Sequence, residues 1–342
     1  MRSLGVMESP LLQVPGAVPA DAPDQEIAAH YGEPTAEQRA LESGRAFVDR
    51  SDRGVVRVPG PDRLSWLHSL LSQHLERLRP GEATQALLLS PNGHIEHHLH
   101  LVDDGEAVWA HVEPGTAPAL TEFLDRMRFL LRVEVEDISD SYAVVTVPEG
   151  TEAEGPAFPD LAGTTTRIVR RDALPGLAER LRSAGVRPAG LWAYEALRIA
   201  EHRPRFGLDT DHRSIPHEMG WIEEAVHLEK GCYRGQETVA RVHNLGRPPR
   251  RLVFLHLDGS VDRLPAHGDP VDIPGGRTVG FVGSAARHHE LGPIALALVK
   301  RTVPVDVELL AGGVAAAQEV VVSPDTGANA KIELRRQAAH RG

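Results

Sequence analysis

Residues 230–241 read KGCYRGQETVAR and contain Cys232, the single cysteine of the chain. A lone thiol makes no internal disulfide, so another property must account for it. Gly231 and Gly235 let the backbone turn tightly and let a ligand approach closely. Three cations lie in the same stretch: Lys230, Arg234 and Arg241. Since nearby cations favour a thiolate, the stretch predicts an exposed, reactive sulfur on a turn; the alternative is a buried structural cysteine.

The composition is typical of a globular protein, with 41% hydrophobic and 25% charged residues. A chain of 342 residues is expected to divide into two or three domains, since single cores rarely grow beyond roughly 250–300 residues. One cysteine without a disulfide framework fits a reducing compartment, so we expect a cytoplasmic location. No apolar run approaches the roughly 20 residues of a membrane span, and no signal peptide is predicted.

The charge balance bears on nucleic-acid binding. The formal net charge of −11 opposes tight nonspecific binding, which requires a broad basic surface. Aromatic residues make up only 4% of the chain, which gives little support for a base-stacking platform. We therefore expect no strong direct binding to nucleic acid.

The positions of proline, glycine and polar residues, which favour turns and loops, suggest four segments. They are a flexible tail at 1–28, a first α+β domain at 29–113, a second α+β domain at 114–248, and a barrel-like domain at 249–337. The tail is proline-rich with little periodicity. The last segment consists of short β-branched runs separated by turn residues, which favours a small antiparallel barrel or sandwich.

Local patterns predict the main elements. Asn92-Gly93 lies between strand-like runs at 86–90 and 95–102, which indicates a β-hairpin. Helices are predicted from about 60 to 71, at 118–131, at 173–184 and at 192–200. The segment 202–228 shows few regular signals but is too apolar for disorder, so we expect it to pack and to line a cleft.

Residues 230–237, followed by Ala240 and Arg241, resemble the signature of the YgfZ family. These are folate-binding proteins related to the T-protein (aminomethyltransferase) of the glycine cleavage system. Weaker similarities lie at 58–63, 90–95, 196–199 and 215–218. The resemblance implies a T-protein-like α+β fold, with three domains around a central channel and a small antiparallel C-terminal β-barrel.

The resemblance also implies a function. It implies binding of tetrahydrofolate or a derivative, and a role in assembling or repairing iron–sulfur clusters in client enzymes, including enzymes that modify tRNA. The implied partners are folate and these iron–sulfur client proteins, and we expect a monomer. Cys232 is then the expected catalytic group, which would act on or protect an iron–sulfur intermediate.

The expected folate contacts are Tyr194, Lys230, Gln236, Glu237 and Arg241. Tyr194 aligns with an aromatic position that stacks on folate in relatives. The cations would hold an anionic group such as the glutamate tail of a folate. For Arg241 the alternative is a surface ion pair, and for Gln236 and Glu237 it is a bracing or capping role in the turn.

Two departures from the T-protein pattern count against aminomethyl transfer. His97 and His98 stand where a T-protein has two aspartates, one of which assists the folate chemistry. Ala200 stands where relatives have a glutamate that contacts the pterin, and Glu201 follows one step later, which is a rotation of about 100° on a helix. A folate-dependent C1-transferase or demethylase remains an alternative, as does a noncatalytic adaptor that docks client proteins.

The histidines at 94, 97, 98 and 100 raise the possibility of a metal site. On a strand, three of them would share one face, but no second cluster supplies further ligands. We expect a polar face with one packed, hydrogen-bonded histidine, and no metal. One thiolate cannot supply the four cysteines of a typical cluster, so no stable cluster is expected on this chain alone.

Overall fold

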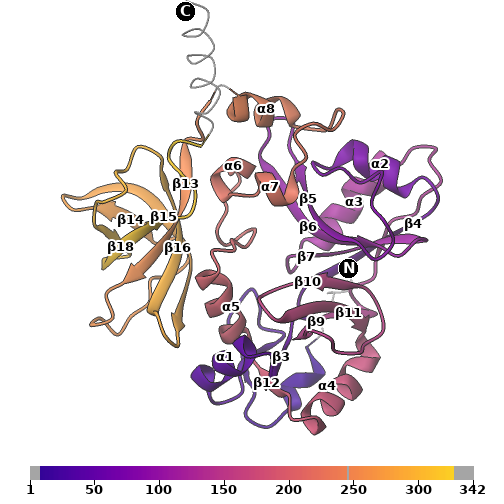
Figure 1. Ribbon diagram of the computed structural model, residues 1–342, viewed down its shortest axis with the longest axis horizontal. Helices are drawn as coiled ribbons and strands as arrows, with labels where there is room; N and C mark the ends of the chain where they lie inside the picture. Colours follow the sequence, from indigo (N-terminus) through magenta and orange to yellow (C-terminus); the bar gives the residue numbers. More distant parts are fainter. Residues whose placement is uncertain (1–7, 245, 327–342) are drawn as a thin grey trace, which may run out of the picture. The chain divides into compact units, whose positions relative to one another are not determined.

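The computed structural model describes residues 8–244 and 246–326 (Figure 1). The chain divides into two compact units. Unit 1 consists of Met1–Leu67, Leu75–Gln85 and His97–Glu201. Unit 2 consists of His68–His74, Ala86–Glu96 and His202–Gly342.

Two five-stranded sheets form before residue 190. The first has the order β5-β6-β7-β4-β8. Its strands are β4 (Gly54–Pro59), β5 (Ala83–Leu89), β6 (Ile95–Asp103), β7 (Ala107–Val112) and β8 (Glu136–Asp137). The second has the order β10-β11-β9-β3-β12. Its strands are β3 (Ala46–Asp49), β9 (Tyr142–Pro148), β10 (Ala157–Pro159), β11 (Thr164–Arg170) and β12 (Arg187–Ala189). A two-stranded ribbon pairs β1 (Val18–Pro19) with β2 (Ala28–His30).

Helices cover the second sheet through apolar stripes. On α4 (Leu174–Ser183), Leu174, Leu177 and Leu181 recur at helical spacing and are buried in the same core as Phe47 of β3. On α5 (Leu191–Ala200), Ala193 and Leu197 pack with Leu41 of α1 (Pro34–Glu42). Figure 1 shows α1 and α5 side by side. The remaining elements of this half are η1 (Pro10–Gln13), α2 (Arg63–Leu70), α3 (Ala117–Met127) and η2 (Arg171–Ala173).

The predicted hairpin is confirmed between β5 and β6. The Ser90 amide donates to the His94 carbonyl oxygen at 2.8 Å, and the Gly93 amide donates to the Ser90 carbonyl oxygen at 2.9 Å. Gly93 has φ +79°, a conformation that favours glycine. The turn signal in the sequence therefore marked the hairpin correctly.

Unit 2 ends in a closed six-stranded barrel with the order β13-β16-β15-β14-β17-β18. Its strands are β13 (Arg250–Leu257), β14 (Pro270–Ile273), β15 (Arg277–His288), β16 (Gly292–Lys300), β17 (Leu309–Ala311) and β18 (Val314–Val320). Every pairing in it is antiparallel, and fourteen buried residues form one continuous core. The mixed α+β class and the small antiparallel C-terminal barrel are thus confirmed.

The segment 202–228 contains two short helices, α6 (Pro216–Met219) and α7 (Ile222–Ala225). Ile215, Met219 and Trp221 are buried, so the segment is packed as expected. A third helix, α8 (Gln236–Asn244), follows Cys232 and was not predicted. Val239 is its only buried residue, so it has no apolar stripe for the sequence to reveal.

Residues 8–28 differ from the loose tail expected of them. Leu11 is 3% exposed and belongs to the core that contains Phe47 and Leu177. The Ser9 hydroxyl donates to the Asp49 carboxylate, and the Ser9 amide donates to the Glu26 carbonyl oxygen. Proline discourages regular helix and strand, but it does not prevent a single apolar side chain from entering a core.

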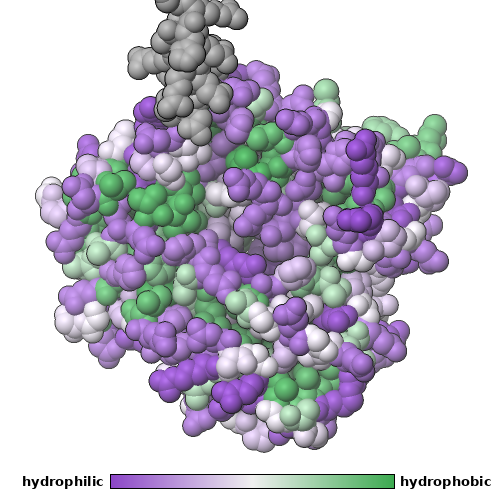
Figure 2. Space-filling model, viewed as in Figure 1, coloured by the Kyte–Doolittle hydropathy of each residue, from purple (hydrophilic) through white to green (hydrophobic). Residues whose placement is uncertain are grey.

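Hydrophilic and hydrophobic side chains are interspersed over the face drawn in Figure 2. None of the helices within residues 8–244 and 246–326 has the length and apolar character needed to cross a bilayer.

Candidate functional site

Cys232 lies in unit 2, on the loop between α7 and α8, and it is exposed. The next side chain, Tyr233, is only 8% exposed. The Tyr233 amide donates to the Gln236 side-chain oxygen at 3.1 Å. Gln236 therefore has the bracing role that the sequence left open, and the loop presents its sulfur to solvent while its neighbour is anchored.

Gly235 fixes the loop against the β5–β6 turn. Its φ is +82°, and a Cβ atom there would lie 2.6 Å from the Ser90 carbonyl oxygen and 3.0 Å from the Gly93 Cα atom. The first contact is shorter than real Cβ atoms show, and the second is tighter than most of their contacts. Two glycines, 235 and 93, are thus needed for the two turns to meet.

The three cations near Cys232 all bind other groups. Lys230 Nζ donates to the backbone oxygens of Leu71 at 2.5 Å, Gln73 at 2.9 Å and His68. Arg234 Nη1 donates to Glu96 at 2.7 Å, and Arg241 Nη2 donates to Glu237 at 2.6 Å. The last pair is a surface ion pair, with both side chains more than half exposed, as the alternative for Arg241 proposed. These contacts brace the loop.

Tyr194, the expected stacking residue, lies in unit 1. Its hydroxyl donates to Asp160 Oδ1 at 2.9 Å, and the Arg50 guanidinium carbon lies 3.8 Å from the centroid of its ring. Burial raises the pKa of Tyr194 to about 12. One face of the ring is therefore covered by a cation, which leaves at most the other face for an aromatic ligand.

His98 and His97 are uncharged at neutral pH. His98 is 6% exposed, and its Nε2 lies 2.8 Å from the Gln85 side-chain oxygen. Burial lowers the pKa of each histidine to about 4. The packed histidine expected on this strand was His97, which is only partly buried. His98, on the face expected to be solvated, is instead the buried and hydrogen-bonded one, so that expectation was wrong. A neutral ring cannot supply the negative charge of a carboxylate at this position.

A polar cluster in unit 1 extends from this strand and was not predicted. The His100 and His111 rings stack with centroids 4.7 Å apart and planes 4° from parallel. Arg53 Nε donates to His111 Nδ1 at 2.9 Å, and Arg53 Nη1 donates to Glu113 at 2.7 Å. Burial and the nearby Arg53 charge hold the pKa of His111 well below its usual value.

The sequence singled out His100, but no signal in it pointed to His111, Arg53 or Glu113 as its neighbours. Arg53 and Glu113 are 60 residues apart, and Arg50 and Tyr194 are further apart still. Only the sheet register, in which His100 pairs with His111, brings the rings together. Glu201, by contrast, behaves as its helical position predicts: its side chain is exposed and accepts from the Ala162 amide at 3.1 Å.

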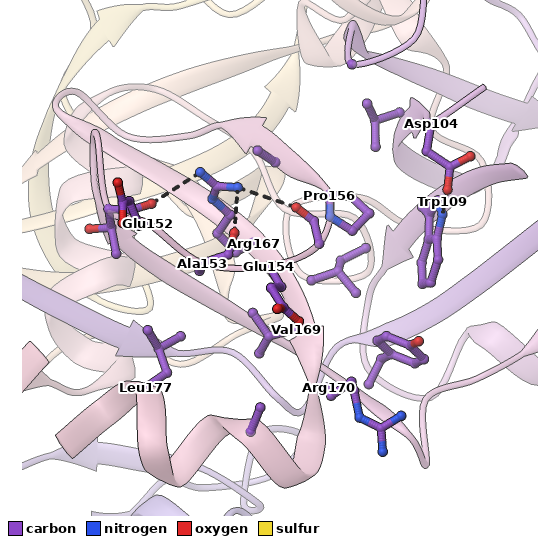
Figure 3. A pocket seen from close by; sticks show the side chains of 18 of the residues that line it. Asp104, Trp109, Glu152, Ala153, Glu154, Pro156, Arg167, Val169, Arg170 and Leu177 are labelled. Carbon is purple, nitrogen blue, oxygen red and sulfur yellow. Dashed lines mark hydrogen bonds between the residues drawn. The ribbon is translucent and has the colours of Figure 1, made fainter. Parts of the chain in front are cut away.

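A cavity of about 1230 Å³ also lies in unit 1 (Figure 3). The Trp109 indole and the loop 150–157 line it, and Trp109 Nε1 donates to Asp104 at 2.7 Å. Arg167 donates to the backbone oxygens of Thr151, Ala153 and Gly155. None of the site residues predicted from sequence lines this cavity.

No protein-family model matches the chain. It is 28% identical over 317 residues to an aminomethyltransferase of Rubrobacter xylanophilus, covering 83% of this chain and 84% of the relative. It is 28% identical over 323 residues to one of Streptomyces coelicolor, covering 83% and 86%. A putative chloroplastic transferase of Arabidopsis thaliana is 24% identical over 295 residues, covering 75% and 66%.

Among solved structures, the chain is similar to the glycine cleavage system aminomethyltransferase T of Bartonella henselae. The TM-score is 0.77 at 19% identity, with 93% of this chain and 96% of that chain covered. The chain thus has the T-protein fold, and its sequence is homologous to aminomethyltransferases.

Proposed function

We propose that this protein binds tetrahydrofolate or a derivative and supports iron–sulfur cluster assembly or repair in client enzymes, with Cys232 as its reactive group. The exposure of Cys232 on a braced loop carries the proposal. A thiolate is a soft ligand that suits iron–sulfur species, and a sulfur that must meet a client protein has to reach solvent. The cluster or its precursor is cargo here, since one sulfur cannot retain it.

The loop has features that suit such a role. The Lys230 ammonium and the Arg234 guanidinium are held by unit 2 itself, so the backbone on both sides of Cys232 is anchored. Gly235 adds a third fixed point. A sulfur presented by a rigid loop loses little conformational entropy when it binds a partner.

Aminomethyl transfer is the second candidate, because the relatives from Rubrobacter xylanophilus and Streptomyces coelicolor are aminomethyltransferases that each align with 83% of this chain. The residues of unit 1 weigh against it. T-protein chemistry, as the resemblance implies it, needs a carboxylate at one of two positions where this chain has the neutral His97 and His98. Folate binding without transfer is compatible both with the similarity to aminomethyltransferases and with the missing carboxylate. It is therefore part of the proposal.

The test is rescue of iron–sulfur enzyme activity in cells that lack this protein, using matched expression of wild type, Cys232→Ser and Glu229→Gln. Glu229 is exposed and three residues from Cys232, so its neutral substitution controls for a general disturbance of the loop. We expect wild type and Glu229→Gln to restore activity and Cys232→Ser to fail. Equal rescue by all three would remove the thiol from the mechanism and favour the docking adaptor.

A second measurement separates the two folate functions. Purified protein is titrated with tetrahydrofolate and then assayed for folate-dependent transfer from an aminomethyl donor. Binding without turnover is expected. Turnover would establish the transferase, whereas the absence of both would overturn the folate part of the proposal.

A further inference from the structure

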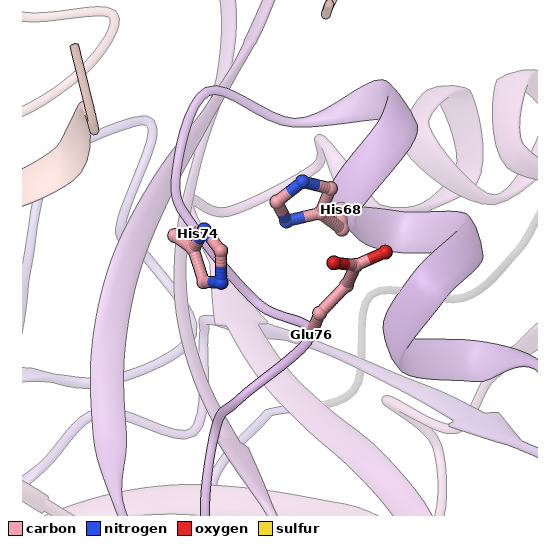
Figure 4. A group of neighbouring side chains, drawn as sticks. All are labelled: His68, His74 and Glu76. Atoms are coloured by element: carbon pink, nitrogen blue, oxygen red, sulfur yellow. The ribbon is translucent and has the colours of Figure 1, made fainter. Parts of the chain in front are cut away.

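We propose that His68, His74 and His227 of unit 2 form a binding site for a divalent first-row transition metal. Zn²⁺ is the ion with which we would test it. The site goes beyond the proposed function, because it uses neither Cys232 nor a folate contact. His68 lies on the last turn of α2, His74 lies in the loop that follows, and His227 follows α7. Figure 4 draws His68 and His74, together with Glu76 of unit 1.

The ring positions suit a shared ion. The His68 and His74 ring centroids are 4.6 Å apart at an interplanar angle of 81°, and those of His74 and His227 are 5.2 Å apart at 48°. Imidazoles bound to one tetrahedral metal at about 2.0–2.1 Å have centroids roughly 5 Å apart. His68 and His74 each offer a ring nitrogen within 4.8 Å of the other. His227 lies outside that 4.8 Å group, so its exposed side chain must rotate toward His74 to bind the same ion.

His74 supplies an independent reason to expect a ligand. Its Nε2 atom is buried and makes no hydrogen bond within the residues that the structure describes. A buried ring nitrogen without a partner is costly, and a metal ion would satisfy it.

Hydrogen bonds hold the two loops in register. The Ser72 hydroxyl donates to the Ala225 carbonyl oxygen at 2.6 Å, and the Gln73 amide group donates to the Glu224 carbonyl oxygen at 3.2 Å. The His227 amide donates to the Ser72 carbonyl oxygen at 3.0 Å. The residues just before His74 are therefore bonded to the residues just before His227 and to His227 itself, which favours a preorganised site.

The chemistry of the donors selects the metal. Three neutral imidazoles suit Zn²⁺, Cu²⁺ or Ni²⁺ better than Mg²⁺ or Ca²⁺, which prefer oxygen. Three histidines leave a fourth position for water or another ligand, as in catalytic zinc sites. The nearby Lys230 ammonium donates to the carbonyl oxygens of His68, Leu71 and Gln73, and these dipoles offset its repulsion of a second cation.

The test is titration of the full, EDTA-treated chain with Zn²⁺ by calorimetry, and with Co²⁺ by visible absorption. We expect one strong site per chain and the intense d–d bands of a low-coordinate Co²⁺ complex, without sulfur-to-cobalt charge transfer. His68→Gln, His74→Gln and His227→Gln should each weaken binding at least roughly tenfold, by analogy with losses of supporting residues at metal sites.

Matched controls make the result decisive. His212 is exposed and lies in unit 2, so His212→Gln should bind as wild type does, and so should Cys232→Ser. Circular dichroism checks that each variant is folded. The inference is overturned if no one-to-one site is found, if any of the three histidine variants binds with wild-type affinity, or if Cys232→Ser abolishes binding.

Discussion

At the scale of single residues, burial decides the charge of the histidines. His97, His98 and His217 are each enclosed enough that burial lowers their pKa to about 4. All three are therefore neutral over the physiological pH range. In the unfolded chain the same rings titrate near pH 6.5.

This difference predicts how stability depends on pH. Below about pH 6.5 these histidines bind protons in the unfolded chain but not in the folded chain. The free energy of unfolding must therefore fall as the pH decreases toward 4. A shift from 6.5 to about 4 corresponds to about 3 kcal/mol for His98. Between pH 7 and pH 4, the free energy of unfolding measured with urea should therefore fall less in His98→Gln than in wild type, by about that amount.

The exposed His212 provides the comparison for this experiment. His212→Gln should keep the wild-type pH profile. If His98→Gln keeps the wild-type profile as well, the His98 ring does not resist protonation in the folded protein, which would contradict the prediction.

At the scale of elements, the loop between α7 and α8 depends on a glycine that no other residue can replace. Gly235 combines a positive φ with backbone and side-chain atoms closer than 3.0 Å to any added Cβ. Gly231, four residues earlier, has a negative or extended φ and no atom within 4 Å of such a Cβ. The two glycines of the signature thus have different structural roles.

Alanine at each position separates these roles. Gly235→Ala should reduce the free energy of unfolding by at least about 1–2 kcal/mol, because it adds left-handed strain to a steric clash. Gly231→Ala should change it by no more than about 0.5 kcal/mol, as at an ordinary surface position. Chemical denaturation of the two variants measures both, and equal effects would show that the loop does not pack as described.

Arg250 connects β13 to the segment around α6. Its Nε donates to Glu218 at 2.9 Å, and its Nη1 donates to Asp211 at 2.6 Å. The Glu218 side chain is fully buried. The strand and the helix are therefore joined by a largely buried charge pair, which salt screens much less than a surface pair.

Removing this arginine should be costly. Arg250→Met leaves the buried Glu218 carboxylate without its cation, for which we expect a loss of about 3–5 kcal/mol in the free energy of unfolding. Arg247→Met, three residues earlier and exposed, should have little effect. Adding Glu218→Gln to Arg250→Met should recover part of the loss; if it recovers nothing, the pair is not the source of the effect.

At the scale of the whole molecule, the net charge of −11 governs contacts with polyanions. The client enzymes implied by the family resemblance include enzymes that modify tRNA. The protein could therefore affect tRNA modification in two ways. The protein either binds the RNA or acts only on the enzyme. An acidic chain favours the second.

We therefore expect no measurable binding of bulk tRNA in a gel-shift assay at about 150 mM monovalent salt, a concentration at which only extensive phosphate contacts give strong affinity. A basic RNA-binding protein run in parallel confirms the sensitivity of the assay. Binding that weakens steeply with added salt would contradict the prediction and support a direct role on tRNA.

Elements whose signals are local could be predicted from the amino-acid sequence. The Asn92-Gly93 turn, the apolar stripes of α4 and α5 and the short strands of the barrel are encoded within a few residues of one another. Turn chemistry and periodicity act over that range, which explains why these elements were predictable. The same holds for the Cys232 motif, whose glycines, cations and thiol are contiguous.

The contacts that those side chains make could not be predicted from the sequence, because they depend on long-range packing. The sequence placed three cations near Cys232, yet packing directs Lys230 to the backbone of 68–73 and Arg234 to Glu96. It also places Arg50 over Tyr194 and His227 beside His74, from positions more than 140 residues apart. Such contacts depend on how sheets and loops meet, and a periodic pattern carries information only about the face of its own element.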